Sequence, residues 1–205
     1  LPRIKICQQI LNIDEIDYFL LPDLEKKYQS ESLDNLNIPK EKRLSSKYYR
    51  HIIADEIIVT DHPYCINNDA DKEIENIPKW ISVWLKNSII IADRESENKN
   101  YPDKVYIDRS DSISNTKKLR SITNEEIVKD FLKKRGFKIL ALSIFSFEEQ
   151  AKIFNKASQI VGLHGAGFAN FCFCEPQTKV VELRSNTSGN VCENLALSNN
   201  LNYKS

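Results

Sequence analysis

The segment QIVGLHGAGFAN, residues 159–170, decides the fold that this sequence predicts. Gln159–Gly162 is a short apolar run, which is typical of a buried strand. The glycines that follow allow a tight turn, and Gly165–Phe171 favours a short helix. Because a strand, a turn and a helix in this order belong to a βαβ unit, we predict a parallel sheet with right-handed crossovers.

The same alternation of strand and helix continues on both sides of this segment. Two helix starts carry capping boxes, in which a Ser or Thr and a Glu three residues later satisfy the first amides of the helix. The predicted strands are Lys104–Ile107, Phe137–Leu142 and Lys179–Leu183. The first predicted helix is opened by Thr123–Glu126, with a hydrophobic staple of Ile122 and Ile127, and it stops at Gly136. The second is opened by Ser146–Glu149 and has Phe147, Ala151 and Phe154 on one stripe. The third is Gly189–Ser198.

Before about residue 92 the sequence predicts a second α/β half. Its predicted strands are Asp17–Leu21 and Ile52–Thr60, the latter because β-branched residues dominate it. Its predicted helices are Pro2–Leu11, Lys26–Leu36 and Pro78–Ile90, the last with Trp80, Val83, Trp84 and Leu85 on its apolar side. We therefore predict two Rossmann-like α/β halves with mostly parallel sheets. Residues 1–92 would be a partial N-terminal lobe, 93–103 a polar linker and 104–205 the C-terminal lobe.

Charge and composition exclude several classes of protein. The 29 basic and 29 acidic residues give zero net charge, so we expect no nucleic-acid partner. The apolar runs are strand-sized, and no membrane span is expected. Five cysteines, scattered apart from Cys172-Phe-Cys174, favour a reducing compartment and are interpreted as small buried apolar residues. The sequence begins at Leu1 and contains no Met, so we interpret it as a fragment.

The glycine-rich turn after His164 is the first candidate binding site. Parallel sheets bind ligands beyond the carboxyl ends of their strands, and free amides at a helix start attract phosphate oxygens. His164 can hydrogen-bond a phosphate or act as an acid or base. Two alternatives are a turn that merely needs small residues and a dinucleotide fingerprint with its third glycine replaced. We favour phosphate binding by Gly165, Ala166, Gly167 and Asn170.

Charged residues near other predicted strand ends are further candidates. Arg109 and Asp111 follow the strand Lys104–Ile107, and Arg120 lies beyond them. A guanidinium can form two hydrogen bonds to a diphosphate, but a solvated loop with surface ion pairs explains the same residues equally well. Glu182 lies near the end of a later strand. A buried carboxylate needs partners, which are either ribose hydroxyls or a nearby arginine.

Six short motifs occur in a fixed order between about Tyr101 and Tyr203. They are VYIDRSD (105–111), R-x-x-x-N-E-E (120–126), G-F (136–137), F-x-x-Q-x-x-x-F (147–154), IVG-x-HGAG-x-x-N (160–170) and VVEL (180–183). In this order and spacing they resemble glycosyltransferase family 61, which includes xylan-modifying transferases, extracellular O-GlcNAc transferases and bacterial capsular polysaccharide proteins. The residues before Tyr101 resemble it weakly. Gln177 stands where the family usually has Gly, so we expect this turn to avoid a positive φ.

The resemblance implies a GT-B-like pair of lobes that transfers a sugar from a nucleotide donor with inversion. Arg109 and the amides of Gly165–Gly167 would neutralise the diphosphate leaving group. His164 would orient or protonate that group, and Glu182 would hold the nucleoside. The resemblance further implies no metal ion, no cofactor besides the donor substrate, a UDP-linked donor, a glycan acceptor and an acceptor base in the first lobe.

We therefore expect a bacterial glycosyltransferase of capsular polysaccharide biosynthesis, cytoplasmic or peripheral to the membrane. Two alternatives come from other classes of protein. One is a Rossmann-like NAD(P) oxidoreductase that uses Gly165–Asn170, which requires an acidic residue about 20 residues after the glycines. The other is a non-catalytic binding module that keeps the fold.

Overall fold

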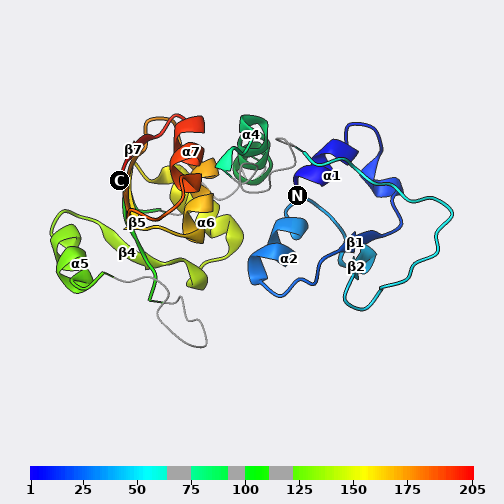
Figure 1. Ribbon diagram of the computed structural model, residues 1–205, viewed down its shortest axis with the longest axis horizontal. Helices are drawn as coiled ribbons and strands as arrows, with labels where there is room; N and C mark the ends of the chain where they lie inside the picture. The colour runs from blue at the N-terminus through cyan, green and yellow to red at the C-terminus, as the bar shows by residue number, and fades with distance from the viewer. Residues whose placement is uncertain (64–74, 92–99, 111–121) are drawn as a thin grey trace. The chain divides into compact units, whose positions relative to one another are not determined.

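The computed structural model describes residues 1–63, 75–91, 100–110 and 122–205 (Figure 1). The chain divides into two compact units, Leu1–Ala70 and Asp71–Ser205. This division falls nearer the N-terminus than the predicted linker at 93–103, most of which lies outside the described residues. It assigns the helix that follows Pro78 to the second unit.

The first unit contains a small βαβ arrangement. Two short helical segments, α1 (Pro2–Cys7) and η1 (Ile13–Glu15), precede it. The strand β1 (Phe19–Leu21) pairs in parallel with β2 (Arg43–Ser45), and α2 (Lys27–Asp34) and the turn η2 (Lys40–Lys42) connect them. Leu33 and Ile38 are buried beneath this crossover. The Arg43 guanidinium joins the crossover by donating to the Asp34 carboxylate and the Ile38 carbonyl.

The predicted strand Ile52–Thr60 is wrong. Its residues have no strand pairing in the structure, and the Ile53 side chain is as exposed as in an extended peptide, at 103%. β-Branched residues favour strands chiefly through packing against neighbouring strands, and here that packing is missing from the described residues. The sequence instead missed β2, whose three residues are too short to show a periodic pattern.

The second unit is built on a five-stranded sheet in which every strand pair is parallel. The strands are β3 (Lys104–Asp108), β4 (Lys138–Ala141), β5 (Gln159–Leu163), β6 (Lys179–Leu183) and β7 (Asn202–Lys204), and their spatial order is β4-β3-β5-β6-β7. The helices are α4 (Lys79–Lys86), continued by a π-helical turn η3 (Asn87–Ile91), α5 (Glu125–Lys133), η4 (Leu142–Ile144), α6 (Phe147–Lys156), η5 (Ala166–Phe173) and α7 (Val191–Ser198). The predicted α/β class with parallel sheets is confirmed.

Alternate residues of the central strands enter two separate cores. Val105 and Ile107 of β3 join the larger core, which is formed with η3, α6, η5 and α7. Tyr106 points to the opposite face, where it packs with Leu132 of α5 and with Phe137. In Figure 1, α6 and α7 accordingly lie beside the strands, and α5 lies next to β4. The sheet is therefore covered by helices on both faces, as expected for βαβ units.

The two predicted capping boxes have different outcomes. Ser146 caps α6, because its hydroxyl accepts from the Glu149 amide while the Glu149 carboxylate accepts from the Ser146 amide. The box at Thr123 is wrong, since α5 begins one residue later with Asn124 at the N-cap and no side-chain cap. The staple fails with it, as Ile127 is exposed. Gly136, with φ of 84°, ends this helix region as predicted.

Two local expectations in the second unit are corrected. In α4 the buried face carries Ile81, and Leu85 packs against the larger core as predicted, whereas Trp80 and Val83 of the predicted apolar side are exposed. At Gln177 the backbone does have a positive φ, 69°, although a side chain disfavours that region. Among the residues that the structure describes, none of the helices is long and apolar enough to cross a membrane.

Candidate functional site

The strand order creates a switch point between β3 and β5. The chain leaves β3 for β4 on one side and then returns past β3 to form β5 on the other side. At such a point the crossovers diverge and leave a crevice beyond the carboxyl ends of the two strands. Arg109 directly follows β3, and His164 directly follows β5. Since Ile107 pairs with Gly162, the register brings Arg109 and His164 side by side.

The Arg109 side chain is fixed against the start of η5. Its Nη1 donates to the main-chain carbonyl of His164 at 2.5 Å. A Cβ atom placed on Gly165 would lie 1.6 Å from the same Nη1 and 2.6 Å from Cζ. Residue 165 must therefore be glycine for the guanidinium to occupy this position. The structure thus joins two sequence candidates, Arg109 and the glycine turn, in one place.

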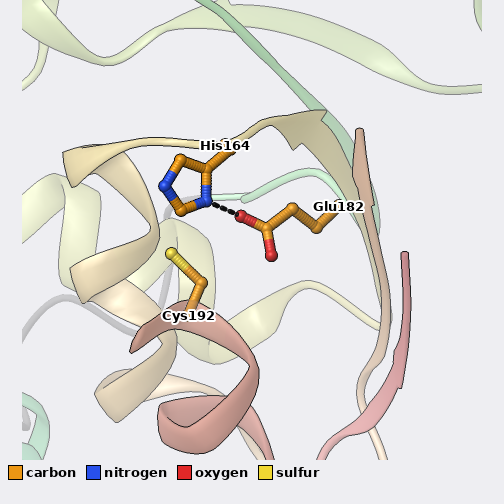
Figure 2. Close-up of side chains that lie close together, drawn as sticks. All are labelled: His164, Glu182 and Cys192. Atoms are coloured by element: carbon orange, nitrogen blue, oxygen red, sulfur yellow. Dashed lines mark hydrogen bonds and ion pairs between the residues drawn. The ribbon is translucent and has the colours of Figure 1, made fainter. Parts of the chain in front are cut away.

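The imidazole of His164 is held by a fully buried carboxylate. Its Nδ1 and Oε1 of Glu182 form a hydrogen bond (Figure 2), and the Tyr203 hydroxyl donates to Oε2 of the same carboxylate. The Glu182 side chain has no exposed surface, whereas that of His164 keeps 14%. A carboxylate on Nδ1 fixes the orientation of the ring and leaves Nε2 as the other functional nitrogen. Both Glu182 oxygens are thus hydrogen-bonded to side chains of this chain, and these partners are His164 and Tyr203 in place of the nearby arginine that was one expected partner. The expected ribose contact stays a prediction.

Cys192, near the start of α7, completes a cluster with these two side chains. Figure 2 shows its sulfur below the imidazole ring, with the Glu182 carboxylate to the right of both. Donor atoms of His164, Glu182 and Cys192 all lie within 4.8 Å of one another. Imidazole nitrogen, carboxylate oxygen and thiolate sulfur are all zinc ligands in proteins. The sequence analysis missed this group, because Cys192 carries no ligand-spacing signal that points to residues 10 and 28 positions earlier.

The start of η5 supplies backbone amides to the same edge of the sheet. Gly165 is its N-cap, and the first amides of any helix lack carbonyl partners within the helix. Ala166 is exposed. Asn170 is buried instead, and its amide donates to the Gly167 carbonyl and to Gln150 of α6. In this structure Asn170 therefore holds η5 in place.

A charged network fixes the residue immediately before Arg109. Asp108 accepts from the Ser110 amide and hydroxyl, and the Lys129 ammonium lies 3.2 Å from its carboxylate. Burial acts to raise the pKa of Asp108, but the hydrogen bonds from Ser110 and Lys129 outweigh it and hold that pKa below its ordinary value. Lys129 also lies 3.6 Å from Glu125, which accepts from the buried Tyr106 hydroxyl. The end of β3 is thus anchored before the chain reaches Arg109.

Two of the predicted site residues, Asp111 and Arg120, lie outside the described residues. Tyr203 and Lys129 were missed by the sequence analysis, and both act on the site through another side chain. Tyr203 lies on β7, a three-residue strand that the sequence did not predict. The signal available for Lys129 was its helical position, four residues after Glu125.

Comparison with known sequences adds to this geometry the class of protein, which is a glycosyltransferase. Residues 1–181 match the family described as Glycosyltransferase 61, and the chain belongs to that family. The matched range includes the first hundred residues, where the sequence motifs are weak, and it ends just before Glu182. No curated protein matches the chain.

Proposed function

We propose that the switch-point crevice binds the diphosphate of a nucleotide-sugar donor and that the sugar passes to a glycan acceptor with inversion. The observation that carries this proposal is the placement of the Arg109 guanidinium against Gly165, at the carboxyl ends of β3 and β5. A permanent cation and the amides of a helix start are two independent attractions for phosphate oxygens. Their convergence at the position where parallel sheets bind ligands supports an anionic ligand.

Arg109 binds the diphosphate in this account. One of its N–H groups is used by the His164 carbonyl, and a guanidinium has five. The bond to that carbonyl holds the fork in a fixed orientation before the donor arrives. Preorganised charge of this kind lowers the barrier for a leaving group that gains negative charge as it departs.

His164 acts on the leaving group through Nε2, while Glu182 and Tyr203 keep the ring in position. The acceptor oxygen attacks the anomeric carbon from the face opposite the diphosphate, so the bond to the diphosphate oxygen breaks as the new glycosidic bond forms. The imidazolium form of His164 donates through both ring nitrogens, with Nδ1–H donating to the Glu182 carboxylate and Nε2–H giving a hydrogen bond or a proton to the departing oxygen. The base that removes the acceptor proton belongs to the acceptor side.

The donor nucleoside and the biological acceptor are proposed from the resemblance. They are uridine and a bacterial cell-surface polysaccharide such as a capsule, with transfer at the cytoplasmic side of the membrane and without a metal ion. The oxidoreductase alternative needs an acidic side chain that can reach ribose hydroxyls. Glu182, the acidic residue nearest to the required spacing, has both oxygens engaged by His164 and Tyr203.

The test is a calorimetric titration of the chain with UDP, GDP, UDP-sugars, NAD and NADP. We expect a nucleoside diphosphate to bind and Arg109→Ala to weaken it about 10- to 100-fold, since hydrogen bonds to charged groups contribute about 1.5–3 kcal/mol. Arg135→Ala is the matched control, because Arg135 follows α5 and stacks on Phe131 of that helix, away from the switch point. Binding of NAD or NADP without any response to nucleoside diphosphates contradicts the proposal.

A further inference from the structure

The cluster of His164, Glu182 and Cys192 contains more donor chemistry than the transfer reaction uses. Hydrogen bonds of Glu182 with His164 and Tyr203 orient the imidazole, and the Cys192 sulfur adds a third type of donor atom beside this pair. Cys192 is buried within 4.8 Å of both donor atoms, on a different element of the fold. Three donors of three types thus converge from β6, α7 and the turn after β5.

The geometry points to a binding site for a zinc-class divalent cation, ligated by the His164 imidazole, the Glu182 carboxylate and the Cys192 thiolate. Zinc bonds of about 2.0–2.3 Å in a tetrahedron place neighbouring ligand atoms roughly 3.5 Å apart. The donor atoms of His164 and Glu182 are hydrogen-bonded and so lie closer together than this, whereas the full spread of the three donor atoms reaches 4.8 Å. Ligation therefore moves the first two atoms apart and brings the Cys192 sulfur nearer, each by about 1 Å. A water molecule completes the four ligands.

Charge and hydrogen bonding both suit such an ion. A carboxylate and a thiolate together neutralise a divalent cation, so the occupied site buries no net charge. Oε2 of Glu182 is held by the Tyr203 hydroxyl, which orients Oε1 toward the imidazole. Partners of this kind, one step removed from the metal, align ligands and typically raise affinity 10- to 100-fold. Metal binding releases the Cys192 thiol proton, and the cation takes the place of the proton between His164 and Glu182, which leaves the N–H of the imidazole on Nε2.

The experiment is a titration of the 205-residue chain with Co²⁺, followed by displacement with Zn²⁺. We expect one equivalent of Co²⁺ to produce a thiolate-to-cobalt charge-transfer band and the intense visible bands of four-coordinate cobalt, and Zn²⁺ to remove both. Cys192→Ser abolishes the charge-transfer band. Tyr203→Phe keeps the band and weakens Co²⁺ binding about 10-fold.

The matched control is Cys7→Ser, which removes a cysteine that does not belong to the cluster and retains the band. Absence of the band in the unaltered chain, or its persistence in Cys192→Ser, overturns the proposal. If Cys192→Ser fails to fold by circular dichroism, cadmium NMR of the unaltered chain decides. A chemical shift for one sulfur ligand supports the site, and a shift for oxygen and nitrogen ligands alone contradicts it. Nucleotide titrations do not enter these readouts, so the transferase proposal stands or falls separately.

Discussion

The guanidinium of Arg109 fills the space that a side chain at residue 165 would occupy. The closest approach of an added Cβ would be 1.6 Å, far inside any permitted contact. Arginine and glycine are 56 positions apart in the sequence, yet any side chain at residue 165 would displace Arg109 from its present position. The first glycine of the HGAG motif is thus explained in part by the space that the Arg109 side chain occupies, in addition to any contact with a ligand.

Gly165→Ala should displace Arg109 and weaken binding of the nucleoside diphosphate at least about 10-fold, because the fork loses its preset orientation. Calorimetric titration measures this change. Gly189→Ala is the matched control, since a Cβ there meets only an ordinary contact of 3.8 Å with Glu75. Equal affinities for Gly165→Ala and Gly189→Ala would contradict the role assigned to Arg109.

Glu182→Gln should lower kcat for the donor about 100-fold with a smaller change in KM. The amide keeps the shape of the side chain but removes the negative charge that faces the imidazolium of His164, and it can present N–H to Nδ1, which weakens the orientation of the ring. Steady-state kinetics on the donor identified by titration provide the measurement. His164→Ala should lower kcat by a similar factor, and the double variant should lower it little further, because the two residues act as one unit. Additive losses contradict this coupling.

Asp108→Asn should reduce the dependence of stability on acid pH. The pKa of Asp108 is lowered in the fold, so its contribution is present above the unfolded pKa and is lost as pH falls through the folded pKa. We expect a loss of about 1–2 kcal/mol at neutral pH and a flatter decline below about pH 4. Urea unfolding across this range measures both. An unchanged acid slope would show that Lys129 does not stabilise the charged form of Asp108.

Gln177→Gly should stabilise the chain by about 0.5–1 kcal/mol. The left-handed conformation at residue 177 destabilises the fold by about 1–2 kcal/mol when the residue has a side chain, and glycine removes this strain. Part of the stabilisation is then lost, because glycine has a larger conformational entropy in the unfolded chain. Asn200→Gly is the control, because Asn200 also has a positive φ but asparagine tolerates it. Thermal unfolding measures both variants, and equal changes in Tm for the two substitutions would contradict this explanation.

The sequence predicts the second unit well because its elements have local signals. The run Lys179–Leu183, the Ser146 capping box and the HGAG turn each carry their pattern within a few residues. The three-residue strands β2 and β7 carry no such pattern, and strand pairing that depends on distant residues is invisible locally. The apolar run Ile52–Thr60 fails for the same reason, since its strand propensity has no partner strand in the described part of the chain.

The residues of the candidate site likewise fall into those with a local sequence signal and those without one. Arg109, His164 and the glycines are found from motif and position, because each lies within a few residues after a predicted strand. Tyr203 and Cys192 join the site only through the fold, which brings β7 and α7 next to Glu182. Glu182 itself is found by its strand, but its partners depend on those two elements. Partners of a buried carboxylate are a tertiary property, and the sequence left them open.

The most direct test compares the affinities of the nucleoside diphosphate and monophosphate for the unaltered chain and for Arg109→Ala. If Arg109 and the turn after His164 bind the second phosphate, the diphosphate should bind the unaltered chain at least about 10-fold more tightly. That preference should disappear in Arg109→Ala, whereas monophosphate affinity should change little. Equal affinities for the two nucleotides in the unaltered chain, or a preference that survives Arg109→Ala, would contradict a diphosphate site at the switch point.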